Sequence, residues 1–340
     1  MTIMSTPIIR VSAVVLRDPH GRVLTVRKKG TSTFMFPGGK PEAGESAADA
    51  AVREVREEVG LPLSTDDLIE LGTFTTAAAN EAHRRVEAVV FAAPLTGAPQ
   101  AAAEIAELAW VDPRHLGSDH SGDLPGGLPG DLSGNRSLAP LLTDAVLPAL
   151  AHHPVRFLAV FMGARLGVAP ANLRLAQELG TLMASNNTRL IYGGGKVGLM
   201  GAVADAVIEA GGHATGVIPQ HLVDREVAHP GLTTLEIVPT LNARKQRMSE
   251  LADGFVCLPG GAGTLDEFFD AWTGQQLGEH TKPIALLGRE FWAPTLAMLD
   301  HMVTQGYIRS EDRDSLIVAD TAEELFTEFA AWQPPLPKWA

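Results

Sequence analysis

From residue 155 onward, short apolar runs alternate with helical stretches, and this alternation constrains the fold more than any other feature. Three apolar runs end in or near glycine: "VRFLAVFMG" (155–163), "TRLIYGGG" (188–195) and "GFVCLPGGAGT" (254–264). Helical patterns follow them, as in "GLMGAVADAVIEAGG" (198–212) and "LDEFFDAWTGQQLG" (265–278). Strands that alternate with helices predict a parallel, doubly wound α/β sheet. Ligands of such sheets bind where glycine turns leave the carboxyl ends of the strands.

The first half of the chain has a different pattern, with short strands around one long helix. Turn residues 117–135 are dense in Gly, Ser, Asp and Pro, and "SLAPLLTDAVLPALA" (137–151) predicts one amphipathic helix that covers a sheet. We therefore expect two domains, 1–151 and 155–335, with the boundary near residues 152–154. Strands of the first domain are expected within these ranges: 11–16, 22–28, 68–76, 84–95 and 108–113.

Composition excludes several classes of function. The net charge is −13 and the pI about 5.3, so the chain lacks the basic excess of a general nucleic-acid or anionic-membrane surface. Cys257 is the single cysteine and stands in an apolar run, which predicts a packed core thiol and a reducing, cytoplasmic compartment. We recognise neither a signal peptide nor an apolar run of about 18 residues, so no membrane span is expected.

An acidic helix is predicted at about 47–59. Ser46 followed by Asp49 resembles a capping box, and Gly60 suits the position after the last turn. At 100° per residue one stripe is apolar and faces the core, namely Ala48, Val52, Val55 and Val59.

Three glutamates, Glu54, Glu57 and Glu58, occupy the sector beside that stripe. Like charges crowded next to a buried face need compensation, and a divalent cation would supply it. Hard carboxylate oxygens suit Mg²⁺ or Mn²⁺, which also bind substrate phosphates. The alternative is a solvated acidic face.

The segment that carries these glutamates resembles the Nudix box, G-x5-E-x7-R-E-U-x-E-E-x-G-U, where U is apolar. Its fixed positions are filled here without departure, by Gly39, Glu45, Arg53, Glu54, Val55, Glu57, Glu58, Gly60 and Leu61. The resemblance covers residues 1–151 and implies an α/β/α sandwich that hydrolyses the pyrophosphate of a nucleoside diphosphate linked to X. It implies that Glu54, Glu57 and Glu58 hold the metal, with Glu57 and Glu58 catalytic.

The same resemblance gives structural roles to the rest of the motif. Gly38 and Gly39 would shape the loop, Glu45 would support it, and Arg53 would orient the glutamates. A further carboxylate often comes from a later loop, and Glu104 and Glu107 are equal candidates, with a surface role as the alternative for either.

The segment "TAAANEAHRR" (76–85) is expected to face the substrate. Within it His83, Arg84 and Arg85 are either substrate contacts or solvated side chains. The nucleotide that the first domain takes is not specified by these residues.

Two glycine turns mark the second half, "YGGGKVGLMG" (192–201) and "PGGAGTLDE" (259–267). Each ends a strand and opens a helix, where backbone amides and the helix dipole favour an anion. Neither turn is a P-loop, and neither fits the dinucleotide fingerprint at its usual place after the first strand.

Together with "NARKQRM" (242–248), these turns resemble the Lonely Guy family of cytokinin riboside 5′-monophosphate phosphoribohydrolases, over residues 155–330. The resemblance implies hydrolysis of the N-glycosidic bond of an adenosine-type 5′-monophosphate, as in cytokinin activation or in an AMP nucleosidase, without a cofactor. Arg244 and Glu267 would be catalytic, and the domain would form a homodimer. The implied substrate-binding residues are Gly193, Gly194, Gly195, Lys245, Gly260, Gly261, Gly263 and Thr264.

Two departures from that family leave the base open. "FMGAR" (161–165) stands where the family more often reads Cys-Gly-Ser, and Arg165 is a candidate for a different phosphate or ribose contact. Leu241 replaces a methionine. Lys196 is either a ligand contact or solvated. The family has also been labelled lysine decarboxylase, but the sequence offers no basis for a pyridoxal-phosphate site.

The sequence thus predicts a bifunctional nucleotide hydrolase of small-molecule substrates, because the product class of the first domain is the substrate class of the second. One alternative is a sensor or carrier in which a domain binds a nucleotide without turnover, since molybdenum-cofactor carriers resemble the second fold. Another is Nudix housekeeping with an auxiliary second domain. Channelling between the domains is not readable from the sequence.

Overall fold

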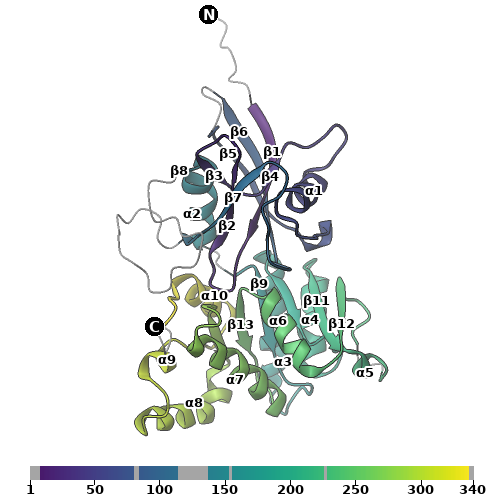
Figure 1. Ribbon diagram of the computed structural model, residues 1–340. Coiled ribbons are helices and arrows are strands. Elements are labelled where there is room, and N and C mark those ends of the chain that lie inside the picture. The colour runs from purple at the N-terminus through teal and green to yellow at the C-terminus, as the bar shows by residue number, and fades with distance from the viewer. Residues whose placement is uncertain (1–7, 80–83, 114–136, 153–154, 226–227, 337–340) are drawn as a thin grey trace, which may run out of the picture. The chain divides into compact units, whose positions relative to one another are not determined.

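The computed structural model describes residues 8–79, 84–113, 137–152, 155–225 and 228–336. The chain divides into two compact units, Met1–His152 and His153–Ala340. Each unit has its own sheets and its own buried hydrophobic clusters (Figure 1). Among the described residues, no helix has the length and apolar character that crossing a membrane requires.

The first unit contains two four-stranded sheets, with strand orders β4-β1-β6-β5 and β7-β2-β3-β8. Its strands are β1 (Ile8–Leu16), β2 (Val23–Lys28), β3 (Thr33–Met35), β4 (Gly38–Gly39), β5 (Ile69–Ala77), β6 (Arg85–Ala93), β7 (Ile105–Val111) and β8 (Ser137–Leu138). Its helical segments are α1 (Ala47–Val59), a 3-10 turn (Thr65–Asp67), a π-helical segment (Leu141–Val146) and α2 (Leu147–His152).

Strand β1 is apolar on both faces because helical segments cover both. Val14 and Leu16 pack in one cluster with residues of α1, whereas Ala13 and Val15 pack in another with Leu142 and other residues of the C-terminal helical segments. Successive side chains of a strand point to opposite faces, so the nine residues of β1 contribute side chains to two hydrophobic cores. This is the α/β/α arrangement expected from the sequence.

The predicted continuous helix at 137–151 is wrong at its start. Ser137 and Leu138 form β8, which pairs with Thr33 and Phe34, and the helical part begins only at Leu141 as a π-helical segment. Pro148, in the first turn of α2, has no amide hydrogen to donate to a preceding carbonyl, which disfavours a regular α-helix through this point.

The second unit is one seven-stranded parallel sheet in the order β12-β11-β10-β9-β13-β14-β15, which confirms the predicted doubly wound fold. Its strands are β9 (Phe157–Phe161), β10 (Arg189–Tyr192), β11 (Ala214–Pro219), β12 (Thr234–Val238), β13 (Gly254–Cys257), β14 (Ile284–Leu287) and β15 (Ile317–Ala319). Its helices are α3 (Pro170–Ser185), α4 (Gly198–Glu209), α5 (Gln220–Val223), α6 (Leu241–Leu251), α7 (Ala262–Leu277), α8 (Arg289–Thr304), α9 (Ser310–Asp314) and α10 (Ala322–Ala331).

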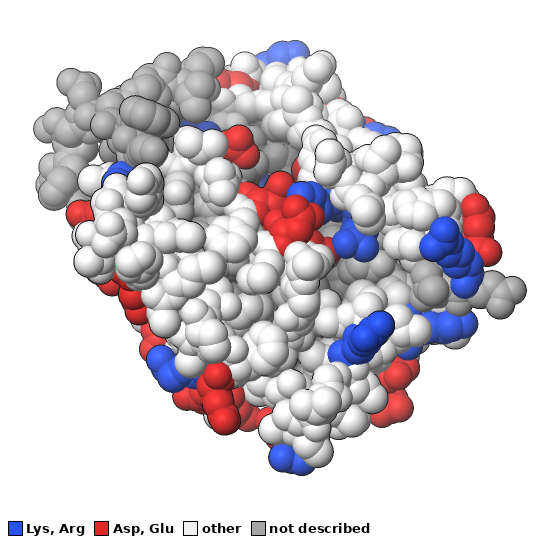
Figure 2. All heavy atoms as spheres, turned by 90° about the horizontal axis from the view of Figure 1, so that it is seen from below, with Lys and Arg blue, Asp and Glu red and all other residues white. Residues whose placement is uncertain are grey.

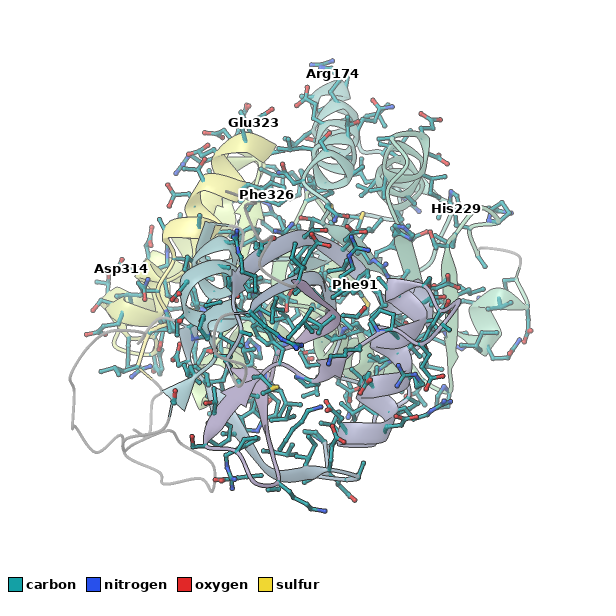
Figure 3. The ribbon with its side chains drawn as sticks, turned by 90° about the horizontal axis from the view of Figure 1, so that it is seen from above. Phe91, Arg174, His229, Asp314, Glu323 and Phe326 are labelled. Atoms are coloured by element: carbon teal, nitrogen blue, oxygen red, sulfur yellow. The ribbon has the colours of Figure 1, made fainter. Side chains whose placement is uncertain are left out.

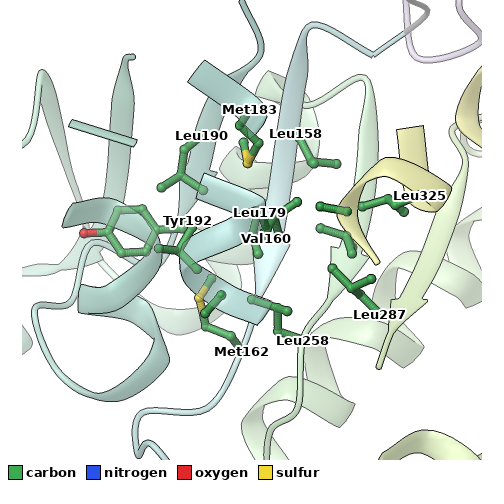
Figure 4. Packing of buried hydrophobic residues seen from close by; sticks show 14 of the residues in the cluster. Leu158, Val160, Met162, Leu179, Met183, Leu190, Tyr192, Leu258, Leu287 and Leu325 are labelled. Carbon is green, nitrogen blue, oxygen red and sulfur yellow. The ribbon is translucent and has the colours of Figure 1, made fainter. Parts of the chain in front are cut away.

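One hydrophobic core of the second unit lies between the sheet and the helices α3, α4 and α10. Leu158 and Val160 of β9 meet Leu179 of α3 and Leu325 of α10 in one buried cluster (Figure 4). Cys257 is fully buried on β13, and burial raises the pKa of its thiol well above the usual value. This confirms a packed core thiol.

Charged side chains lie on the outer faces of the helices. Arg174 on α3 and Glu323 on α10 are exposed and project outward in Figure 3. Acidic and basic side chains are interspersed among uncharged ones on the face in Figure 2. That mixed distribution agrees with the acidic net charge and is not the continuous basic surface typical of nucleic-acid binding.

Candidate active sites

Helix α1 begins and ends where the sequence predicts. The Ser46 side chain accepts a hydrogen bond from the Asp49 amide, and Gly60 closes the helix in the left-handed region, with φ 71°. Val55 and Val59 are fully buried, as expected, but Ala51 is buried with them while Val52 is only half-buried. The buried stripe is therefore rotated slightly from the predicted one.

Glu58 is the most deeply buried of the α1 glutamates, with 1% of its surface exposed. Its Oε2 accepts a hydrogen bond from the Gly38 amide at 2.9 Å, and its Oε1 lies 3.1 Å from Lys28 Nζ. Burial raises the pKa of the Glu58 carboxyl, while Lys28 and the Gly38 amide act in the opposite direction. A buried carboxylate in this setting needs a cation beside it.

Arg53 joins the loop before α1 to the glutamates of the helix. It donates two hydrogen bonds of 2.9 Å to the carboxylate of Glu45 and one of 2.9 Å to Glu54. Glu57 lies 3.4 Å away and is half exposed. Arg53 lowers the pKa of the Glu45 carboxyl to about 2. The guanidinium therefore fixes both the loop and the carboxylates, which is the geometry that an orienting residue requires.

Because Gly38 and Gly39 have no side chains, the Ser12 backbone can lie close to Gly38 and the Glu54 carboxylate close to Gly39. A Cβ at Gly39 would lie 2.2 Å from Glu54 Oε1, and one at Gly38, where φ is 152°, would lie 2.1 Å from the Ser12 carbonyl oxygen. At Gly38 the backbone leaves no room for a side chain, whereas a side chain at Gly39 would displace the Glu54 carboxylate.

A cavity of about 560 Å³ opens beside α1 and receives all three glutamates. Of the two later carboxylates, Glu104 lines this cavity and forms an ion pair with Lys28. Glu107 instead pairs with Arg27 at 2.9 Å. The geometry thus favours Glu104 over Glu107. Lys28, which the motif does not include, also lines the cavity. The basic run Arg27–Lys29 is the sequence feature that could have pointed to this residue.

The residues of this cavity fit a divalent cation by chemistry. Glu58 Oε1 is buried and has no hydrogen-bond partner, although it lies beside the Lys28 ammonium group. Glu54 and Glu57 supply further hard oxygens to the same cavity. Within the described part of the chain, no three acidic, imidazole or thiolate groups converge closely enough to form a metal site as they stand.

Three described residues of the expected substrate-facing segment line the cavity. Ala77, Ala78 and Ala79 line the cavity, whereas the exposed Arg84 and Arg85 are not among the lining residues, and His83 lies outside the described residues.

The second unit has a cavity of about 550 Å³ at the carboxyl ends of β9 and β13, where the strand order reverses. This is the place at which doubly wound sheets bind ligands. Arg244 of α6 and Glu267 of α7 meet there, with 2.5 Å between Nη2 and Oε1. Burial raises the pKa of the Glu267 carboxyl, and Arg244 acts against that rise.

The second glycine turn forms one wall of this cavity through Gly260, Gly261, Gly263 and Thr264. Helix α7 begins at Ala262, so Thr264 lies in its first turn, where free amides and the helix dipole favour an anion. This is the arrangement expected of a phosphate cradle.

The three glycines of the first turn, Gly193–Gly195, have different surroundings. Gly193 lines the cavity, and a Cβ there would lie 3.2 Å from Arg244 Nη1. Gly194, with φ 74°, packs against Gly216 and Ile218, and Gly195 forms a β-bridge with Ala228. Neither Gly194 nor Gly195 is among the described lining residues.

The lysines expected near this site point elsewhere. Lys245 Nζ lies 3.1 Å from both Asp266 and Asp270 on α7, and Lys196 lines a separate groove between α3 and α4. The segment Met162–Arg165, where the sequence differs from the family pattern, lines the cavity. Phe291 of α8 also lines it, although the sequence analysis did not single out this residue.

Gly260→Ala is expected to destabilise the second unit by about 1–3 kcal/mol, the usual cost of overpacking. Its Cβ would lie 2.0 Å from Thr264 Oγ1, and Thr264 is buried. Gly261→Ala is the matched control, since no atom lies within 4 Å of its Cβ position. The melting temperature of each variant, obtained from thermal unfolding, measures the change in stability. Equal melting temperatures for the two would contradict the packing described here.

If the second unit releases a base from a nucleotide, as its resemblance implies, the acid limb of that activity is expected above pH 4.5, the ordinary pKa of a glutamate. If Glu267 acts as a carboxylate, its protonation inactivates the site, and a raised pKa moves that loss to higher pH. Asp266 contributes to the rise, so Asp266→Asn is expected to move the limb to lower pH. The pH dependence of kcat/KM tests both statements, and a limb at or below pH 4.5 in the unaltered protein would refute the first.

Comparisons with known proteins identify both halves of the chain. The NUDIX domain family model matches residues 7–127, and the family model described as "Possible lysine decarboxylase" matches residues 200–329. The cytokinin riboside 5′-monophosphate phosphoribohydrolase of Rhodococcoides fascians is 40% identical over 189 residues, which are 55% of this chain and 95% of that protein. The enzyme LOG of Oryza sativa subsp. japonica is 38% identical over 180 residues, 53% of this chain and 74% of that protein.

Solved structures give weaker likenesses. The molybdenum cofactor binding protein of Rippkaea orientalis has 22% identity and a TM-score of 0.42, with 52% of this chain and 95% of that chain covered. A MutT/nudix family protein of Enterococcus faecalis has 22% identity and a TM-score of 0.28, with 32% of this chain and 46% of that chain covered.

The NUDIX match lies within the first unit, and the cytokinin riboside 5′-monophosphate phosphoribohydrolase of Rhodococcoides fascians is matched over 95% of its own length. Both families are families of hydrolases. The chain carries a Nudix domain in its first half and, through its second half, belongs to the family of cytokinin riboside 5′-monophosphate phosphoribohydrolases.

Proposed function

We propose that the chain is a bifunctional nucleotide hydrolase that acts on nucleotides in two successive reactions. The first unit cleaves the pyrophosphate bond of a nucleoside diphosphate linked to X and yields a nucleoside 5′-monophosphate. The second unit hydrolyses the N-glycosidic bond of an adenosine-type 5′-monophosphate. The observation that carries the proposal is the contact of 2.5 Å between Arg244 and Glu267 beside the Gly260–Thr264 turn.

In the second unit, water adds to C1′ of the ribose while the bond from C1′ to the base nitrogen breaks. The products are the free base and ribose 5-phosphate. The Glu267 carboxylate stabilises the cationic, oxocarbenium-like ribose or accepts the proton of the water. Arg244 stabilises negative charge on the phosphate or on the departing base. The backbone amides of the Gly260–Thr264 turn hold the 5′-phosphate.

In the first unit, Glu54, Glu57 and Glu58 are the residues that would hold Mg²⁺ or Mn²⁺. A divalent ion held there would polarise a phosphoryl oxygen and lower the pKa of water. Arg53 holds Glu54 and the Glu45 loop in place, and Lys28 beside Glu58 and Glu104 places a positive charge where substrate phosphates enter.

A cytoplasmic homodimer through the second unit completes the proposal. Apolar side chains near the second cavity are exposed in the single chain, among them Leu166, Val168 and Phe291. A second copy of the chain would cover such residues. Analytical ultracentrifugation at micromolar concentration tests the dimer, and a single monomeric species would exclude it.

A panel of nucleotides with Mg²⁺ tests the two reactions. Free base is expected from adenosine-type 5′-monophosphates with or without a chelator, whereas phosphate or pyrophosphate release from di- and triphosphates is expected to stop when a chelator is added. If no monophosphate yields free base, the proposal for the second unit fails, and if no nucleotide yields phosphate or pyrophosphate, the proposal for the first unit fails.

A further inference from the structure

The cavity of the Nudix unit has two halves of opposite chemistry. One half borders α1 and its preceding loop and carries the charged side chains, including Arg53, Glu54 and Glu58. The other half borders β1, β3, β6 and the π-helical segment and carries apolar side chains.

The apolar half is built on the hydrophobic cluster beneath it. Val11, Met35, Val86 and Leu141 line the cavity, and each is partly buried against the cluster that contains Ala13, Val15 and Leu142; Met35 also packs against the cluster beneath α1. Their remaining surface is therefore available to a ligand in the cavity. Methionine adapts to irregular apolar shapes, which suits an occupant that is not flat.

The charged side chains of the cavity come from α1, from its preceding loop and from Lys28 and Glu104, and Lys28 pairs with both Glu104 and Glu58 of α1. On β1, Val14 and Leu16 pack beneath α1, so Ser12 faces α1 as well, and its register partner is Gly39 of the Nudix loop. Val11 and Ala13 face the opposite side. Among the described lining residues, the apolar half therefore has no side chain that could read the polar edge of a base.

From this division we infer that the Nudix unit prefers a nucleoside di- or triphosphate whose base carries an apolar substituent. The inference rests on the function proposed above and names the substrate class of its first site. The phosphates lie in the charged half beside α1, and the substituted base occupies the half lined by Val11, Met35, Val86 and Leu141. Burial of the substituent supplies the selectivity, because the hydrophobic contribution grows with the apolar area removed from water.

The reaction leaves the substituent untouched. Water attacks a phosphorus atom, one phosphoanhydride P–O bond breaks, and the products are the substituted nucleoside 5′-monophosphate and phosphate or pyrophosphate, with a proton released to solvent. No oxidant or reductant takes part. The monophosphate then has the chemical class that the second unit is proposed to hydrolyse.

The test compares the triphosphates of N6-isopentenyladenosine and adenosine with the full-length protein and Mg²⁺. Phosphate and pyrophosphate release reports on the Nudix unit alone, since glycosidic cleavage liberates neither. We expect kcat/KM to be at least about tenfold higher for the isopentenyl substrate, the discrimination that an apolar pocket typically achieves. A ratio of one or less would overturn the inference while leaving the Nudix activity intact.

Val11→Thr supplies a second, independent measurement, because it keeps the shape of the side chain and adds a hydroxyl to the apolar half. The ratio of the two kcat/KM values is expected to fall about threefold or more. Ile8→Thr is the matched control on the same strand, since Ile8 is 54% exposed and does not line the cavity. A ratio that Val11→Thr leaves unchanged would contradict the assignment of this half. If neither triphosphate is hydrolysed, the proposed Nudix function itself fails.

Discussion

Glu267→Gln is expected to lower base release from 5′-monophosphates by about two to four orders of magnitude, the usual contribution of an acid–base group. The amide keeps the size of the side chain and an oxygen that can accept the hydrogen bond from Arg244. It cannot carry the negative charge that stabilises a cationic ribose or accept a proton from water. Chromatography of free base against time measures the loss.

Asp266→Asn is the matched control for that substitution. Asp266 precedes Glu267 on α7, but its side chain is exposed and pairs with Lys245 outside the cavity. At neutral pH, above the acid limb, we expect its base release to stay within about twofold of the unaltered protein. Comparable losses in both variants would show that charge on α7 matters in general and that Glu267 has no special role.

Glu58→Gln is expected to reduce phosphate or pyrophosphate release at least about 100-fold, because loss of a metal ligand should cost no less than loss of an outer-shell partner. The amide oxygen still accepts the hydrogen bond from the Gly38 amide, so the loop stays in place. Base release in the second unit is expected to remain unchanged. Product release and the affinity of the protein for Mn²⁺ are the two measurements.

Glu107→Gln is the control for the first unit. Glu107 is a carboxylate of the neighbouring strand β7 that pairs with Arg27 and does not line the cavity. Its substitution should leave both phosphate release and Mn²⁺ affinity nearly unchanged. An unchanged Mn²⁺ affinity in Glu58→Gln would remove Glu58 from the proposed metal site.

Local sequence signals predicted the elements that hold these residues. The caps Ser46 and Gly60 and the spacing of the valines placed the helix at 47–59, which is where α1 lies. The alternation from residue 155 onward predicted the parallel sheet. Such features depend on neighbours within one or two turns, so a single sequence contains them.

Features set by distant contacts were not predictable. The strands β12 and β15 are short, and β12 lies at the sheet edge with its apolar side chains partly exposed, so neither has a strong pattern of its own. The choice of Glu104 over Glu107 depends on the antiparallel pairing of β2 with β7 and on a register shift at Arg27 and Lys28. That irregularity is a property of the folded sheet and leaves no mark in the sequence.

The motif residues of the second unit divide for a similar reason. The Arg-Lys pair is continuous in sequence, yet Arg244 faces the cavity while Lys245 reaches Asp266 and Asp270 on α7. Adjacent residues of a helix point about 100° apart, so only one of them can meet Glu267.

The central claim is that one chain performs two hydrolyses in order, and one incubation tests it most directly. Adenosine triphosphate or its isopentenyl analogue is supplied with Mg²⁺ to the unaltered protein, to Glu58→Gln and to Glu267→Gln, and every product is separated by chromatography. The account predicts free base from the unaltered protein, accumulation of the monophosphate with Glu267→Gln, and intact triphosphate with Glu58→Gln. Free base formed from the triphosphate by either variant at the rate of the unaltered protein, or none formed by the unaltered protein, would contradict it.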